Sequence, residues 1–274
     1  MATKNSVQRS GRIFIGTGGW SFAPWRGEFY PAGLAQSREL AYMSARLNSI
    51  EINSTFYGPQ KPATFQRWHD ETPADFVFAV KGPMSVSNRR DLADSRAGIE
   101  RFLDGGVLNL ARKLGPVNWQ LSPGKRFAAA EIDGFLSSLP AERDGRKLRH
   151  AIEVRHASFA APEFILLAQR HGVAIVLAGD SGYPQIANPT ASFCYLRIMG
   201  TADDETKGYP AAMLTRWAQR ARTLALGDTP TGLELTPGVA AIKPQRRDVF
   251  LYVISGAKRR NPAAAVALLA RLSR

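Results

Sequence analysis

The stretch Glu51-Ile52-Asn53-Ser54-Thr55-Phe56-Tyr57 contains the clearest structural pattern in this chain. Side chains two apart on a β-strand point to the same face. Ile50 and Ile52 therefore share one face of a short strand, and Glu51 and Asn53 share the other. The apolar face suits a covering helix, so the polar face predicts a strand that ends by presenting a carboxylate and an amide to the interior.

Outward from this stretch, short β-like runs alternate with amphipathic helical segments. Most of these runs are continuously apolar, which is typical of parallel strands covered on both faces. The predicted strands are residues 13–17, 49–53, 76–81, 117–121, 150–155, 173–178, 193–198 and 249–254. The predicted helices are 38–47, 62–71, 95–114, 131–139, 162–171, 211–226 and 262–272. Eight strands separated by helices predict an α/β fold, a parallel (β/α)8 TIM barrel, ahead of a doubly wound open sheet.

Two segments depart from this alternation. Residues 181–191 lack a helical period and contain Pro184 and Pro189, so the helix after strand six is expected to be missing or short. Residues 228–247 are rich in Gly and Pro, and a loop of this length is usually functional or mobile. We expect a flexible N-terminal tail over residues 1–12 and a single TIM-barrel domain over residues 13–274.

Length and composition indicate a globular, non-membrane protein. The chain has 274 residues, of which 45% are hydrophobic, enough for a sizeable core. No run approaches the roughly 18 apolar residues of a membrane span, and the polar start lacks the apolar segment of a signal peptide. The single cysteine, Cys194, excludes an internal disulfide framework and is interpreted as a core thiol. A cytoplasmic location is expected.

The charge of the chain favours an anionic partner. It has 36 Lys and Arg against 23 Asp and Glu, a net charge of +13. Residues 243–274 contain eight basic residues and one acidic residue, Asp248, which gives this segment +7. Such a field attracts phosphorylated small molecules or nucleic acid. A basic surface that only maintains solubility is the alternative.

Polar side chains gather at the C-terminal ends of the predicted strands, where TIM barrels carry their chemistry. The eight residues are Glu51, Asn53, Lys81, Gln120, Glu153, Arg155, Asp180 and Arg197. One hypothesis is a catalytic pocket, with Glu51, Glu153, Asp180 and Lys81 as catalytic candidates and the remaining polar groups binding substrate. The alternative is a plug of ion pairs that neutralise one another.

Aromatic residues follow the first two predicted strands. Trp20 and Trp25 lie in the loop after strand one, and Phe56 and Tyr57 lie in the loop after strand two. Aromatic side chains on the rim of a site stack on sugars or nucleobases. They are candidate substrate-binding residues, and a hydrophobic lid over the barrel is the alternative.

A basic run, Lys258-Arg259-Arg260, follows the last strand, on the side of a barrel that often binds phosphate. Lys258 and Arg259 are therefore candidate substrate-binding residues, with a solvated basic turn as the alternative. His156 is the one histidine at a predicted C-terminal strand end and joins the same set.

The sequence predicts no cofactor and no metal centre. Because the other histidines lie on helices or at a strand start, a multi-histidine metal site is not expected. A Mg²⁺ ion on Glu51, Glu153 or Asp180 remains open, although neighbouring cations oppose it. The chain contains no nucleophile elbow, Walker loop or dinucleotide-binding fingerprint.

These motifs together resemble the YecE-like family (domain of unknown function number seventy-two), TIM-barrel proteins of unestablished activity. The resemblance rests on Gly16 to Trp20, Phe29-Tyr30-Pro31, Glu51 to Tyr57, Leu114 to Leu121, and Glu153 with Arg155. It implies a TIM barrel with its site at these strand ends. Three features depart from the family pattern: Met199 replaces the usual histidine, Ser255-Gly256 replaces an asparagine pair, and Ser122-Pro123 replaces two prolines.

The residues leave three functional hypotheses. The first is an enzyme that binds an anionic, phosphorylated or nucleic-acid-derived ligand and performs hydrolytic or acid/base chemistry, with Glu153 or Glu51 as the base. The second is a non-catalytic nucleic-acid-binding protein that uses its basic C-terminal segment. The third is a carbohydrate-active barrel.

Overall fold

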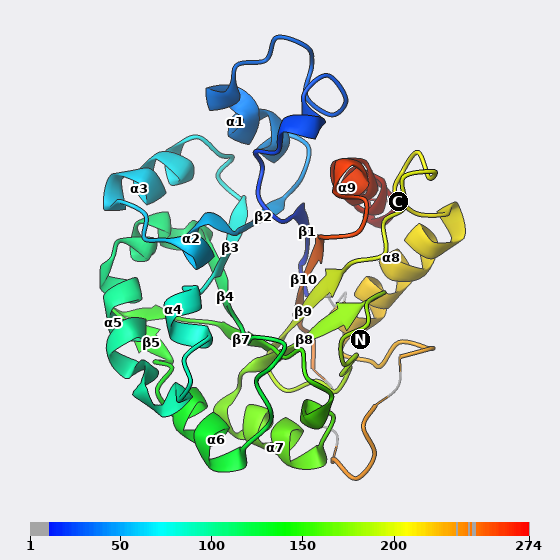
Figure 1. Cartoon of the computed structure of the whole chain (residues 1–274). Helices are drawn as coiled ribbons and strands as arrows, with labels where there is room; N and C mark the ends of the chain where they lie inside the picture. The colour runs from blue at the N-terminus through cyan, green and yellow to red at the C-terminus, as the bar shows by residue number, and fades with distance from the viewer. Residues whose placement is uncertain (1–10, 234, 241, 243–244, 274) are drawn as a thin grey trace, which may run out of the picture.

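The computed structural model describes residues 11–233, 235–240, 242 and 245–273. Within them, eight parallel strands form one sheet that curls into a nearly closed barrel, with the helices outside it (Figure 1). The strands are β1 (Ile13–Thr17), β2 (Ser49–Ile52), β3 (Val77–Lys81), β4 (Leu114–Gln120), β7 (His150–Glu153), β8 (Ala174–Gly179), β9 (Phe193–Ile198) and β10 (Asp248–Val253). The predicted TIM barrel is confirmed. A small antiparallel pair, β5 (Glu142–Arg143) and β6 (Arg146–Lys147), lies between β4 and β7 in the sequence.

The barrel closes between β1 and β2 through a seam held largely by a side chain. The hydrogen-bonded order runs β1-β10-β9-β8-β7-β4-β3-β2, and a bridge from Gly18 to Glu51 joins its two ends. The Asn48 side chain adds two bonds to β1: its Oδ1 accepts from Ile15 N at 2.7 Å, and its Nδ2 donates to Ile13 O at 2.8 Å. One amide side chain thus replaces part of a backbone ladder.

Strand alternation divides the buried apolar residues into two cores. The inner core fills the barrel and includes Phe14, Tyr195, Phe250 and Tyr252, and the outer core lies between strands and helices. As predicted, Ile50 and Ile52 belong to the outer core. The intervening residue, Glu51, points into the barrel and pairs with Arg197 on β9. The polar groups of the site therefore stand on an apolar barrel floor.

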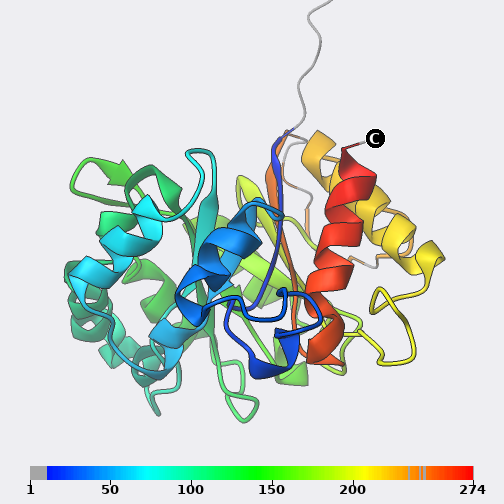
Figure 2. The same ribbon diagram turned by 90° about the horizontal axis from the view of Figure 1, so that it is seen from above.

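The helices follow the predicted alternation, with one correction. They are α1 (Glu39–Ser44), α2 (Ser54–Tyr57), α3 (Pro62–Asp70), α4 (Met84–Ser87), α5 (Arg96–Asp104), α6 (Ala129–Ser137), α7 (Pro162–His171), α8 (Ala211–Leu226) and α9 (Asn261–Leu272). Helices α8 and α9 lie side by side on one flank (Figure 2). The prediction of one helix over residues 95–114 is wrong. Gly106 has a φ of +101°, a left-handed conformation that ends α5, and a 3-10 segment follows it.

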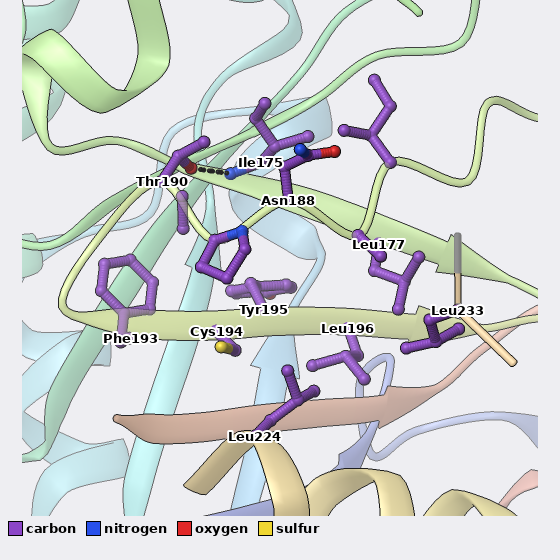
Figure 3. A pocket seen from close by; sticks show the side chains of 14 residues that line it. Ile175, Leu177, Asn188, Thr190, Phe193, Cys194, Tyr195, Leu196, Leu224 and Leu233 are labelled. Carbon is purple, nitrogen blue, oxygen red and sulfur yellow. Dashed lines mark hydrogen bonds between the residues drawn. The ribbon is translucent and has the colours of Figure 1, made fainter. Parts of the chain in front are cut away.

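The predicted absence of a helix after strand six is confirmed, because residues 180–192 between β8 and β9 contain no helix. Thr190 secures this segment: its Oγ1 accepts from Ile175 N at 3.1 Å and donates to Val173 O at 2.7 Å. A void of about 30 Å³ remains beneath it, lined by residues of β8, β9 and α8 (Figure 3). Cys194 borders this void, and burial raises the pKa of its thiol to about 11, so the thiol is a structural group.

The predicted tail, residues 1–12, lies outside the described residues except for its last two. Gly11 N donates to Ala225 O at 3.0 Å, and Arg12 N donates to Asp248 Oδ1 at 2.9 Å. These bonds attach the start of β1 to the end of α8 and to β10. No helix in the described part of the chain combines the length and apolar character needed to span a bilayer.

Candidate functional site

The C-terminal strand ends bring seven of the eight predicted polar side chains to one end of the barrel. They stand at the ends of β2, β3, β4, β7 and β9 or immediately after: Glu51, Asn53, Lys81, Gln120, Glu153, Arg155 and Arg197. Because every second residue of a strand faces inward, side chains from opposite walls meet across the barrel axis.

Arg197 lies at the centre of this group. Its Nη2 is 2.9 Å from Glu51 Oε1, and its Nη1 donates to Glu153 Oε2 and, at 3.2 Å, to Gln120 Oε1. The Tyr195 hydroxyl donates to the other Glu51 oxygen at 2.6 Å. Burial would lower the pKa of Arg197, but Glu153 and Glu51 raise it above its ordinary value. Arg197 is thus a permanent cation that joins two buried carboxylates.

Glu153 is fully buried and engaged on both oxygens. Arg155 donates to its Oε1 from Nε at 2.9 Å and from Nη2 at 2.8 Å, and Asn118 Nδ2 is 3.3 Å from Oε2. Burial alone would raise the pKa of Glu153, but Arg197, Arg155 and Lys81 together lower it below its ordinary value. Glu153 therefore stays ionised and serves as a counter-charge.

Lys81 has a different environment. Its Nζ donates to Gln120 Oε1 at 2.7 Å and lies 3.8 Å from the centre of the Phe56 ring. Among the described residues, no carboxylate lies within ion-pair distance of this ammonium, since Glu51 and Glu153 pair with arginines. Burial, followed by the charge of Arg197, lowers the pKa of Lys81 from 10.5 to about 8. Lys81 can therefore exchange a proton near neutral pH.

A cavity of about 540 Å³ opens above these side chains, within the size range of small-molecule sites. Four of the described residues that line it are cationic, namely Lys81, Arg155, Arg197 and Lys258, and none of them is acidic. Glu51 and Glu153 are fully buried beneath the cations. A molecule entering the cavity consequently meets positive charge, with the negative charge behind it.

The predicted aromatic residues divide between wall and core. Trp20, Phe56 and Tyr57 line the cavity, and Tyr57 is 78% exposed. Trp25 does not line it: its side chain is buried, and its Nε1 donates to Lys258 O at 2.9 Å. Trp25 therefore fits the lid interpretation and fixes the backbone from which Lys258 reaches the cavity.

Two predicted site residues point elsewhere. Asp180 has a φ of +54°, which turns its side chain outward, and its Oδ2 accepts from Trp217 Nε1 on α8 at 2.7 Å. His156 caps a short turn, with its Nδ1 accepting from Ser158 N at 3.1 Å. Neither residue lines the cavity. The structure thus leaves Lys81 as the one catalytic candidate that lines the cavity among the described residues.

Only the first residue of the basic run reaches the cavity. Arg259 Nε lies 3.3 Å from Glu28 Oε2, and Arg260 Nη1 lies 2.8 Å from Glu28 Oε1. Arg260 also donates to the backbone oxygen of Asp203. Asp203 Oδ1 lies 3.6 Å from Arg259 Nε, so two carboxylates, Glu28 and Asp203, face these two arginines.

Sequence reasoning missed two supporting residues, Tyr195 and Asn118. Each lies two positions before a predicted site residue, Arg197 and Gln120 respectively, and so shares its strand face. Extending the period-two pattern one step toward the N-terminus of each strand would have identified both.

The described residues contain no group of three or more His, Cys, Asp or Glu side chains placed to hold a metal ion. The two buried carboxylates of the site face arginine guanidinium groups. The candidate site is therefore described by its cations, its aromatic wall and its amide groups.

Comparison with known proteins identifies the family. The model of the family described as "Protein of unknown function DUF72" matches residues 14–274. The UPF0759 protein YecE of Escherichia coli strain K12 is 31% identical over 152 residues, which cover 54% of this chain and 50% of the relative. The alignment thus spans about half the length of the curated relative.

Two solved structures share the fold. A DUF72 family protein from Thermotoga maritima aligns with a TM-score of 0.73 at 20% identity, covering 96% of this chain and 100% of the other. One from Enterococcus faecalis aligns with a TM-score of 0.68 at 15% identity, covering 96% and 98%. The resemblance predicted from the sequence motifs is confirmed. Because the family model extends over nearly the whole chain, this protein belongs to the DUF72 family and has that family's TIM-barrel fold.

Proposed function

We propose that this protein is an enzyme that binds a small anionic, phosphate-bearing ligand in the cavity at the C-terminal end of its barrel. The observation that carries the proposal is the arrangement of charge: four cations line the cavity, while the two glutamates that hold the arginines lie beneath them. A self-neutralised plug would instead leave no cation without a carboxylate partner.

The charges at the strand ends do not balance. Lys81, Arg155 and Arg197 carry three positive charges against the two negative charges of Glu51 and Glu153, which leaves +1. Lys258 at the cavity edge adds another. A buried charge without a partner is unfavourable, and an anion 4 Å from a cation gains about 4 kcal/mol at an effective dielectric constant of 20. A bound phosphate group would supply the missing charge.

Unpartnered polar atoms support a ligand here. Asn53 Oδ1, Asn118 Oδ1 and Arg197 Nε are buried and lack a hydrogen-bond partner among the described residues. Asn53 and Arg197 also line the cavity. Buried polar atoms are nearly always paired with protein, water or ligand. A ligand hydroxyl would donate to Asn53 Oδ1, and a phosphoryl oxygen would accept from Arg197 Nε.

We assign the proton transfer to Lys81. It lines the cavity, and its pKa of about 8 lets it act as a base when neutral and as an acid when charged. Glu51 and Glu153 are proposed as positioning residues, because each is buried and bound to Arg197. The arginines and Lys258 would hold the anion while Lys81 exchanges a proton with the ligand or with water in the cavity.

Calorimetric titration with inorganic phosphate and simple phosphate esters tests this proposal. Losing a charge-assisted hydrogen bond costs about 1.5–3 kcal/mol, so Arg155→Ala should weaken binding roughly tenfold to a hundredfold. Arg143→Ala, which removes a surface arginine of β5, is the matched control and should bind as wild type does. Affinity should also fall as the pH rises through about 8, and Lys81→Met should abolish that inflection. Unchanged phosphate affinity in both Arg155→Ala and Lys81→Met would refute the proposal.

The other two hypotheses make different demands on the same surfaces. Nucleic-acid binding through the basic run predicts a steep dependence of affinity on salt that replacement of Lys258 and Arg259 reduces. Glycoside hydrolysis requires two carboxyl groups that face the sugar, whereas Glu51 and Glu153 face Arg197. The titrations above therefore start from phosphate compounds.

A further inference from the structure

A second cavity, of about 670 Å³, adjoins the cationic one. It lies among α2, α3, α4 and α5, and the two cavities share the residues Phe56, Tyr57 and Gln60. Helices α2 and α4 are single turns that contact each other beside the end of β3 (Figure 1). We call this second cavity the apolar groove and define it by Phe56, Tyr57, Phe65, Met84, Arg101 and Phe102.

The apolar groove exposes large hydrophobic side chains to solvent. Tyr57 is 78% exposed and Met84 is 42% exposed. Among the described residues that line the groove, Arg101 is the one charged side chain, and none is acidic. Exposed apolar side chains that line a concave surface commonly mark a binding site. The positive charge of Arg101 does not repel an anion.

Phe56 connects the two cavities physically. Its ring lies 3.8 Å from Lys81 Nζ and packs edge-on against the Tyr57 ring, at 5.2 Å between ring centres. A ligand held at Lys81 therefore meets an aromatic surface immediately beside its anionic group. That surface continues into the groove, because Phe56 and Tyr57 line both cavities.

We propose that the ligand of this protein is an amphiphilic anion. Its phosphate-bearing head would bind at Lys81, Arg155 and Lys258, and its apolar chain or ring would cross Phe56 and Tyr57 into the apolar groove. This inference rests on the proposed function, because it takes the head group from there. It adds the substrate class: a phosphate monoester of a hydrophobic alcohol rather than a uniformly polar sugar phosphate.

Titration of the whole chain with methyl, butyl and hexyl phosphate, alongside inorganic phosphate, tests the inference. A fully buried methylene raises affinity about fourfold, so binding should strengthen by at least roughly tenfold from methyl to hexyl phosphate. Met84→Asp places a carboxylate in the groove at an exposed position and should remove this gain while leaving the affinity for inorganic phosphate nearly unchanged. Leu166→Asp is the matched control, an exposed leucine on α7, and should retain the gain. Tyr57→Ser gives a second variant at an exposed position.

The outcomes separate the two proposals. Equal affinities for methyl and hexyl phosphate, or a chain-length gain that survives both Met84→Asp and Tyr57→Ser, would overturn the groove inference and leave the phosphate site intact. If no member of the series binds, both proposals fall. If hexanol binds as tightly as hexyl phosphate, the groove binds its ligand independently of the cationic cavity. If light scattering shows a dimer that Met84→Asp dissociates, the groove binds a second copy of the chain. Either this result or the hexanol result would overturn the proposal of an amphiphilic ligand.

Discussion

Replacing Arg197 with methionine should destabilise the barrel strongly, although it removes a single charge. Arg197 contacts Glu51 and Glu153, both fully buried, so Arg197→Met leaves two carboxylates with fewer compensating charges. Glu51 would retain the Tyr195 hydroxyl, and Glu153 would retain Arg155. Removing one partner of a buried ion pair costs about 3–5 kcal/mol, which corresponds to a fall in melting temperature of about 10 °C for a domain of this size.

The loss should depend on pH in a defined direction. The pKa of Glu153 in the folded protein lies below its ordinary value. Its stabilising contribution is therefore fully present above the unfolded pKa of about 4.3 and disappears as the pH falls through the lower folded pKa. Melting curves recorded by fluorescence from pH 3 to pH 8 should show the full gap between wild type and Arg197→Met at pH 7. The gap should narrow below about pH 4.

Arg143 provides the control for this experiment. It also contacts two carboxylates, Glu100 at 2.6 Å and Asp104 at 2.5 Å, but at the surface. Arg143→Met should leave the melting temperature almost unchanged, because exposed ion pairs contribute little. The double variant Arg197→Met/Glu51→Gln should recover part of the loss, since a neutral amide needs no counter-charge. Equal effects of Arg197→Met and Arg143→Met at pH 7, or a gap that does not narrow as the pH falls from 7 to 3, would refute the reasoning.

Three further predictions concern separate parts of the molecule. Asn48→Ala should lower the free energy of unfolding by about 2 kcal/mol in urea titrations, because two backbone groups of β1 lose their partner; a loss below the error of the titration would mean that the seam does not depend on this amide. Asp180→Asn should leave phosphate affinity unchanged, whereas Lys81→Met should reduce it, because Lys81 lines the cavity and Asp180 does not. Weaker phosphate binding in Asp180→Asn would contradict the outward orientation of this side chain. Trp25→Phe should weaken phosphate binding while the protein stays folded, because the bond that positions the Lys258 backbone is lost, and equal affinity would show that Lys258 is held by other contacts.

The sequence predicted those parts of the site that depend on short-range periodicity. Glu51 was assigned to the inner face because alternation along a strand determines which face a side chain occupies. Lys81 and Arg197 were candidates because they lie at the C-terminal ends of predicted strands. The structure confirms the barrel and brings these side chains together. The absence of a helix after strand six was also predicted, because residues 181–191 contain two prolines and lack a helical period.

Features that depend on one backbone angle or on distant contacts were not visible in the sequence. Asp180 follows a strand as the other candidates do, but its positive φ turns the side chain toward α8. Trp25 resembles a rim residue until its bond to Lys258, 233 positions away, is known. The apolar groove depends on α2 and α4, single turns that are too short for a helical period to reveal.

The pairing of β1 with β10 has a consequence for how the chain folds during synthesis. Residue 13 pairs with residue 249, and β1 joins β2 largely through the Asn48 seam. On the ribosome, β1 therefore has no main-chain ladder partner until β10 has been synthesised. Contacts this distant in sequence form slowly, and an apolar strand that waits unpaired can bind another chain. Strand β1 is thus open to such contacts until β10 has been synthesised.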